Sequence, residues 1–240
     1  MILPQGSDQE IGLIMMQRRM FEHVDVDLGY NDLSAKTTEQ GRRYVTPEGN
    51  KYPSVTTVVS ILTEHHIREW RNRVGEEEAN RISRHASARG TKVHDVLERY
   101  LKNDEDYLDK CNPVVVSNVN SVVPVLNEHI GKVYAQEFAL YSDHLGLAGR
   151  VDCIAEWDGR LAVIDFKTAK KHKKKEWIEN YFIQESAYAI MWEERTGVPI
   201  VDLVTVIAVD YDEPQVFIEH RDNWAPKLIE TINEYKQRKG

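Results

Sequence analysis

Two aspartates and one lysine are spaced so that a single β-hairpin would carry all three side chains on one face. Apolar, β-rich runs flank the pair Asp158-Gly159, and an Asp-Gly pair in that setting is the strongest short-range signal for a two-residue hairpin turn. Such a turn puts Asp152 directly opposite Asp165. Because strand side chains alternate between faces, Lys167 lies on the same face as Asp165. The spacing therefore predicts two carboxylates and an amine side by side.

Repulsion between the opposed carboxylates indicates what chemistry this hairpin would carry. Opposed Cβ atoms lie ~4.5–5.5 Å apart, and like charges there destabilise a sheet unless something neutralises them. A divalent cation such as Mg²⁺ would do so, because it takes carboxylate, carbonyl and water oxygens. Lys167 would then orient or deprotonate a water beside the metal. The alternative is that Asp152 and Asp165 are solvent-facing residues whose charge Lys167 offsets. Asp is disfavoured in strands and the flanking residues are core-like, which favours the metal site.

These residues also resemble the signature of a known family. The segments VD at 151–152 and IDFK at 164–167, with a helical His upstream and a Gln and Tyr downstream, look like the PD-(D/E)xK nucleases of the RecB type. The resemblance covers residues 45–220 in family order. Within the group the chain is most similar to the mitochondrial genome maintenance exonuclease and its phage relatives. The first Pro of the signature is absent here, at a position that varies in the superfamily.

The resemblance implies an α/β fold with a restriction-endonuclease-like core, in which helices flank a mixed, mainly antiparallel central sheet. A length of 240 residues suits one domain. We expect N-terminal strands and a hairpin, then a helical wall or arch over the site, then the catalytic core, then a closing helix. These parts correspond to residues 1–53, 54–132, 133–220 and 221–240.

The resemblance also implies a centre for Mg²⁺ or Mn²⁺ and assigns its ligands. Asp152, Asp165, the backbone carbonyl of Phe166 and His94 would hold the metal, and the two aspartates with Lys167 would form the catalytic set. His94 stands in a Gly-Thr-x-x-His segment similar to that of the family. Without the resemblance, a His beside an apolar helical stripe is more often a packing residue. As a ligand, imidazole suits Mn²⁺ better than Mg²⁺.

Three further residues are expected to support the site. Glu137 lies in the run 133–143, which reads as the first core strand, and relatives have a Glu in a similar place; the alternative is an acid at the strand edge. Gln184 and Tyr188 lie four apart on one predicted helix and match the Gln-x-x-x-Tyr signature of RecB-type nucleases. The Gln side chain can bond DNA or order the active site, and the Tyr side chain can stack or bond phosphate.

The densest basic run of the chain directly follows the predicted catalytic strand. Basic side chains there would contact a DNA backbone without regard to sequence and in a salt-dependent way. The alternative is a solvated surface, as most charge runs are. The predicted DNA-binding residues are Lys170, Lys171, Lys173, Lys174 and Lys175.

Composition limits the other possibilities. A net charge of −8 excludes a generally basic protein that coats nucleic acid. Cys111 and Cys153 are far apart, so we expect no disulfide, a reducing compartment and none of the four-Cys iron–sulfur clusters that some relatives carry. No apolar run is long enough to span a membrane. The first 20 residues read neither as a signal nor as a transit peptide, and Met1 and Met20 are both possible starts.

Local patterns predict the remaining elements. Residues 21–33 alternate like a short strand, and a hairpin with a Pro-Glu-Gly turn follows. Ser54 would cap a short helix, and Pro124 would interrupt a later one. Further helices are expected over 64–102 and 176–195, then two strands, then a last helix capped by Asp222 or Asn223.

Taken together, the sequence and the resemblance predict a metal-dependent DNA exonuclease that prefers single-stranded ends and acts in replication, recombination or repair. The implied location is the cytoplasm of a bacterium or of a phage-infected host cell. One alternative is a lambda-type exonuclease that processes duplex DNA. Another is a DNA-binding or assembly protein that keeps the fold without catalysis, although a binder would not need the whole set of Asp, Asp, Lys, Gln and Tyr.

Overall fold

The computed structural model describes residues 19–239. The expectation about targeting segments concerns residues that lie largely outside this range. Within it, none of the helices combines the length and the apolar character needed to cross a bilayer.

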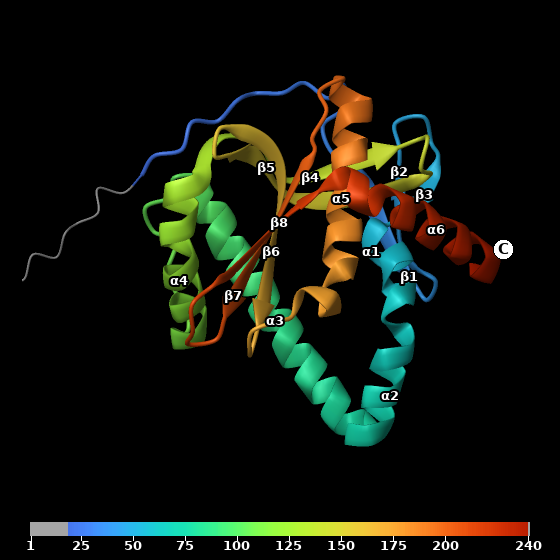
Figure 1. The fold of residues 1–240 in the computed structure, drawn as a ribbon, viewed down its shortest axis with the longest axis horizontal. Coiled ribbons are helices and arrows are strands. Elements are labelled where there is room, and N and C mark those ends of the chain that lie inside the picture. Colours follow the sequence, from blue (N-terminus) through green and yellow to red (C-terminus); the bar gives the residue numbers. More distant parts are fainter. Residues whose placement is uncertain (1–18, 240) are drawn as a thin grey trace, which may run out of the picture.

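A five-stranded sheet forms the centre of the fold, with the strand order β4-β5-β6-β7-β8. Neighbouring strands are antiparallel except β6 and β7, which run parallel and are joined by the helix α5. The mixed, mainly antiparallel sheet flanked by helices is therefore confirmed (Figure 1). Its strands are β4 (Ile130–Ser142), β5 (Leu147–Trp157), β6 (Arg160–Ala169), β7 (Asp202–Val209) and β8 (Gln215–His220).

The β5–β6 hairpin has the turn and the register that its sequence predicts. Asp158 and Gly159 both have positive φ, at 51° and 77°, as a type I′ turn requires. The ladder begins with Trp157 opposite Arg160. Because the hairpin register is set by this two-residue turn, the short-range signal was sufficient to predict it.

Helices cover both faces of the sheet. On one face, alternate strand residues such as Ile154 and Val163 pack against α1, α5 and α6. The residues between them, such as Cys153 and Ile164, pack against α3 and α4. The helices are α1 (Val55–Val59), α2 (Glu64–Val74), α3 (Glu76–Leu101), α4 (Pro113–His129), α5 (Glu179–Thr196) and α6 (Arg221–Lys239), with 3₁₀ turns η1 (Ser60–Leu62) and η2 (Lys175–Trp177).

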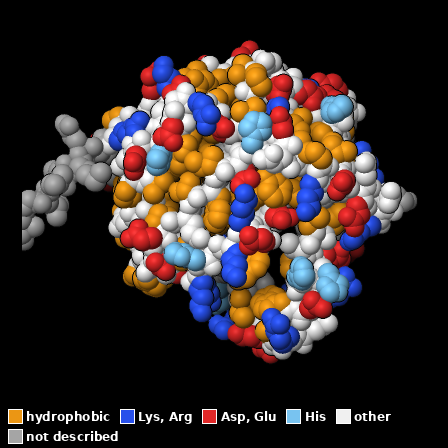
Figure 2. Space-filling view, viewed as in Figure 1, with side chains coloured by type: hydrophobic (Ala, Val, Ile, Leu, Met, Phe, Trp, Pro, Cys, Tyr) orange, Lys and Arg blue, Asp and Glu red, His pale blue; other side chains and the backbone are white. Residues whose placement is uncertain are grey.

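Helices α2 and α3 form a V that projects beyond the end of the sheet (Figure 1). They meet at Gly75, whose φ of +89° is readily adopted by glycine but not by other residues. Figure 2 shows a hollow between this V and the body of the molecule. Both helices lie within residues 54–132, where a helical wall or arch over the site was expected; that role stays a prediction.

Three elements near the N-terminus form a separate small sheet of β1 (Ser34–Thr38), β2 (Gly41–Val45) and β3 (Lys51–Pro53). The predicted hairpin is β2–β3, and Ser54 caps α1 by accepting a hydrogen bond from the Thr57 backbone. Strand β1 was not predicted. The expected strand over 21–33 was wrong, since only His23 forms a bridge there, to Val133. Strand β4 has an irregular register with β5 on either side of Val133.

Two helix predictions also need correction. Helix α4 continues through Pro124. The proline costs about 3 kcal/mol, but Val122 and Leu126 are fully buried on either side of it, and burying each such side chain contributes about 1.5–3 kcal/mol. Helix α6 begins at Arg221, directly after β8, so the predicted cap at Asp222 or Asn223 was wrong.

Candidate metal and active site

Three potential metal ligands meet where α3 crosses the β4–β5 ladder. His94, Glu137 and Asp152 each offer a ligand atom, and these atoms lie within 4.8 Å of one another. The ladder pairs Gln136 with Cys153 and Phe138 with Val151, which places Glu137 opposite Asp152. His94 arrives from α3 with its Nδ1 3.4 Å from Asp152 Oδ2. The register of β4, rather than the hairpin alone, therefore assembles this cluster.

Glu137 carries signs of a functional position. Burial and the neighbouring carboxylate of Asp152 raise the pKa of Glu137 to about 7. Its backbone has a φ of +44°, in the left-handed region that side chains other than glycine rarely adopt. Such a conformation persists only where the surroundings enforce it, and it aims the carboxylate at the cluster. A cation here would relieve the repulsion between Glu137 and Asp152.

Asp165 lies beside this cluster and is held by two partners. Lys167 forms an ion pair with its Oδ2, and Gln184 Nε2 on α5 donates to its Oδ1 at 2.8 Å. Asp165 is 2% exposed, and burial raises its pKa although Lys167 acts against the shift. Burial alone would lower the pKa of Lys167, but the carboxylates of Asp165 and Asp152 outweigh it and raise that pKa. Lys167 therefore holds its proton at neutral pH.

Strands β5 and β6 stop pairing with each other at the site. The ladder between β5 and β6 ends at Cys153 and Ile164. One residue further on, the Asp152 side chain accepts a hydrogen bond of 2.9 Å from the Phe166 backbone N–H. The predicted direct pairing of Asp152 with Asp165 is therefore not part of the ladder, and the two carboxylates have different partners. The Phe166 carbonyl and Asp165 as metal ligands remain predictions.

A comparison with known families identifies the group to which these residues belong. The model of the PD-(D/E)XK nuclease superfamily matches residues 62–237, well over half of the chain. The chain belongs to the PD-(D/E)XK nuclease superfamily. The assignment of Asp152, Asp165 and Lys167 to its Asp, Asp/Glu and Lys positions stays a prediction.

Individual relatives match only part of their own length. Mitochondrial genome maintenance exonuclease 1 from Homo sapiens is 29% identical over 132 residues, which cover 52% of this chain and 38% of the relative. The same exonuclease from Xenopus tropicalis is 29% identical over 151 residues, covering 59% and 42%. The matched segment is thus about two fifths of the length of these curated relatives.

A solved structure gives a weaker likeness. It is a protein from Eubacterium rectale described as a candidate exonuclease, with a TM-score of 0.45 and 13% identity, covering 62% of this chain and 65% of that one.

The donor set of this PD-(D/E)XK nuclease fits a hard or borderline divalent cation. Carboxylate oxygens from Glu137 and Asp152 suit Mg²⁺ and Mn²⁺, and the imidazole of His94 adds a ligand better suited to Mn²⁺. Burial, and after it the neighbouring carboxylate of Asp152, raises the pKa of Glu137, and a bound cation would act against both effects. Glu137, expected only to support the site, lies within the possible ligand set.

The two signature residues on α5 have different surroundings. Gln184 contacts Asp165 directly, as expected for a residue that orders the site. Tyr188 is buried, and burial raises the pKa of its hydroxyl. A Cβ built on Gly149 would lie 2.8 Å from the Tyr188 ring, so the ring packs closely over β5. That packing gives Tyr188 a structural part, and its predicted contact with DNA remains untested.

The lysine run leaves β6 as an exposed loop toward α5. Lys170, Lys171, Lys173 and Lys174 are exposed, and Lys174 Nζ lies 5.4 Å from the centroid of the Trp177 ring. Lys175 is also exposed but forms an ion pair with Glu219. The run is thus available to an anionic ligand mainly through its first four members.

The sequence interpretation missed two side chains near the site. Glu185 is fully buried beneath Asp165, with Thr205 donating to it, and burial raises its pKa well above the ordinary value. Nothing in the sequence marks an acid on α5 as buried. Trp177 is 62% exposed, and its position directly after the lysine run is a signal that was available, because aromatics interleaved with basic residues are typical of nucleic-acid surfaces.

Proposed function

We propose that this protein is a metal-dependent deoxyribonuclease that hydrolyses phosphodiester bonds from the free ends of DNA, preferring single strands. The observation that carries the proposal is the junction of two groups of side chains. The His94, Glu137 and Asp152 cluster adjoins the buried pair of Asp165 and Lys167. One group suits a divalent cation, and the other places a fixed positive charge beside it.

Each group has a distinct part in the proposed hydrolysis. His94, Glu137 and Asp152 would hold Mg²⁺ or Mn²⁺, which supplies Lewis-acid chemistry for phosphoryl transfer. Lys167 would stabilise negative charge that develops on the phosphate. Its raised pKa favours this charge-stabilising part over that of a general base. Gln184 would fix the orientation of Asp165 through its amide hydrogen bond.

The preference for single-stranded ends rests on the relatives and on the V of α2 and α3. The curated relatives are named as exonucleases. A hollow lies between the V and the body of the molecule (Figure 2), and Tyr181, which lines the cavity between α2 and α5, lies near Lys167. Such an opening would admit a single strand more readily than a rigid duplex. Action in replication, recombination or repair is consistent with such an activity.

A comparison of DNA topologies tests the proposal. End-labelled single strands, the matching duplex and a covalently closed single-stranded circle would be incubated with Mg²⁺ or Mn²⁺ and with EDTA. We expect linear single strands to be degraded fastest, circles to persist and EDTA to stop the reaction. Efficient cutting of circles would contradict the need for an end. Faster digestion of blunt duplex would favour the lambda-type alternative, and binding without cleavage would favour the non-catalytic one.

A further inference from the structure

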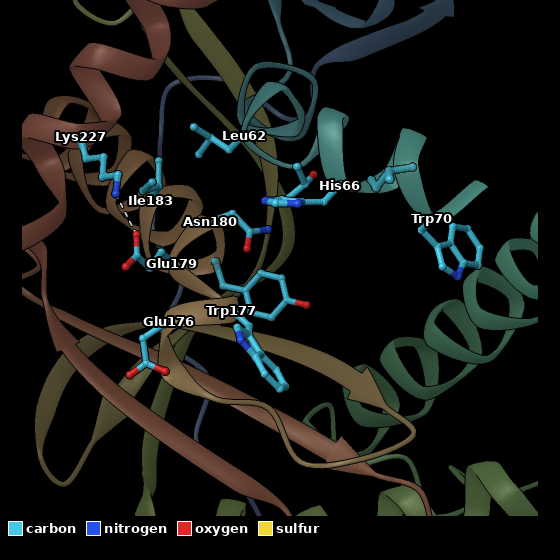
Figure 3. A pocket seen from close by; sticks show the side chains of 12 residues that line it. Leu62, His66, Trp70, Glu176, Trp177, Glu179, Asn180, Ile183 and Lys227 are labelled. Atoms are coloured by element: carbon cyan, nitrogen blue, oxygen red, sulfur yellow. Dashed lines mark hydrogen bonds and ion pairs between the residues drawn. The ribbon is translucent and has the colours of Figure 1, made fainter. Parts of the chain in front are cut away.

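A cavity of about 810 Å³ lies between α2 and the start of α5. His66, Ile67 and Trp70 line it from α2, and Trp177, Asn180 and Tyr181 line it from η2 and α5. In Figure 3 the His66 side chain projects toward Asn180, Trp177 lies on the same side of the cavity as Asn180, and Trp70 lies across it on α2. The cavity is therefore bounded by aromatic rings together with an amide and an imidazole.

A single side chain, that of Tyr181, connects this cavity with Lys167. Tyr181 lines it, and the centroid of the Tyr181 ring is 5.1 Å from Lys167 Nζ. A strand whose phosphate lies at Lys167 would place an adjoining nucleotide within reach of the cavity. The opposite end of η2 joins the lysine run, where Lys174 lies near Trp177.

The charges of the cavity favour a base over a phosphate as its occupant. Glu176 and Glu179 contribute carboxylates to the lining. Glu179 is paired with Lys227 at 2.8 Å (Figure 3), whereas Glu176 forms no ion pair with the other residues that the structure describes. Anionic lining repels a phosphate and leaves a neutral ring unaffected. The phosphates of a bound strand would instead follow the exposed lysines outside.

We propose that this cavity binds a nucleobase of the unpaired strand, with Trp177 as the stacking platform and with Asn180 and His66 as hydrogen-bonding groups for the base edge. The inference rests on the proposed function and adds a second place, beside the metal site, where the protein would hold the strand. The exposed Trp177 ring offers a flat face, and every base has a π-face, so this contact would tolerate any sequence. Asn180 and His66 would modulate which base is preferred.

The test measures binding without hydrolysis, in EDTA. The ligands are a short oligothymidylate and an abasic strand of equal length, which has the same phosphates but no bases. The proteins are the wild type, Trp177→Ala, Trp177→Phe and the control Ile218→Ala. Ile218 is 51% exposed on β8 and does not line the cavity. Melting curves verify that each variant folds, which is expected because Trp177 is mostly exposed.

We expect Trp177→Ala to weaken oligothymidylate binding by about 5- to 150-fold, the range for loss of one stacked base. Binding of the abasic strand should not change. Trp177→Phe should retain much of the affinity, and Ile218→Ala should match the wild type.

Equal loss on both strands, or no loss on either, would overturn the inference while leaving the proposed nuclease function intact. If wild-type protein does not discriminate between the two strands, no base is bound and the inference is equally overturned. Failure of the wild type to bind either strand in EDTA would also overturn the inference, while the cleavage assay with added metal tests the proposed function separately.

Discussion

Replacing Lys167 by methionine should destabilise the protein as well as stop catalysis. Methionine keeps most of the volume of the side chain but removes the ammonium that pairs with Asp165. Asp165 is 2% exposed, so its carboxylate would keep only the hydrogen bond from Gln184. Removing one partner of a buried ion pair leaves a charge that neither solvent nor protein compensates.

The structure sets the size of this effect. Breaking a buried pair in this way costs about 3–5 kcal/mol. Because the Lys167 side chain retains 20% exposure, we take the lower end, about 3 kcal/mol. In a chain of this length each kcal/mol shifts the midpoint by about 2–4 °C, which gives a loss of about 6–12 °C. The loss should shrink as the pH falls from 7 through about 6, because burial raises the pKa of Asp165 to about 6, and the protonated side chain no longer needs a cation.

Thermal melting in EDTA at pH 7 and pH 5 measures the loss of stability and its dependence on pH. The matched control is Asp165→Asn combined with Lys167→Met, where a neutral amide replaces the unpaired carboxylate. That double variant should recover most of the lost stability. A Lys167→Met protein that melts within about 2 °C of the wild type, or a double variant no more stable than the single one, would refute the assignment of Asp165 and Lys167 as a buried charged pair.

Three further predictions concern the metal and the DNA. His94→Ala should raise the Mn²⁺ concentration needed for activity about 10- to 100-fold with little change in melting temperature, whereas a packing His would show the reverse. Because burial and Asp152 raise the pKa of Glu137 to about 7, its carboxyl group must lose a proton before it binds a metal. Isothermal titration should therefore show that Mg²⁺ affinity rises with pH below pH 7, by up to about tenfold per pH unit. The Glu137→Gln variant should show a flatter dependence on pH. Changing Lys173, Lys174 and Lys175 to Gln should reduce the slope of log affinity against log salt for single strands by about 1–2. Lys175 contributes little to this slope because it is already paired with Glu219. An unchanged slope would exclude the lysine run from the DNA path.

The features that the sequence could predict are those set by residues close together in the chain. The turn at Asp158-Gly159 sets the β5–β6 register within a few residues, so that register followed from chain spacing alone. The ladder ends at Cys153 and Ile164, one pair before Asp152 and Asp165 would meet. The His94 assignment was different, because it depended on a family resemblance, and the structure brings His94 to Asp152 from a helix about 60 residues away in the chain.

The remaining features depend on contacts between distant segments. Glu137 joins the possible ligand set only because β4 resumes a regular register with β5 after its irregularities, which no local pattern indicates. The burial of Glu185 depends on the packing of α5 against β7, where Thr205 meets it. Similarly, the continuity of α4 through Pro124 depends on tertiary burial that outweighs a local preference.

The central claim is that a divalent cation held beside Asp152 is required for hydrolysis of DNA. The most direct measurement is release of label from an end-labelled single strand by EDTA-treated protein, with and without added Mg²⁺ or Mn²⁺, for the wild type and for Asp152→Asn. We predict that hydrolysis depends on added metal and that the substitution lowers the rate on the order of 100-fold or more, in a protein that remains folded. Hydrolysis that persists in EDTA, or a folded Asp152→Asn variant that acts at the wild-type rate, would contradict the account.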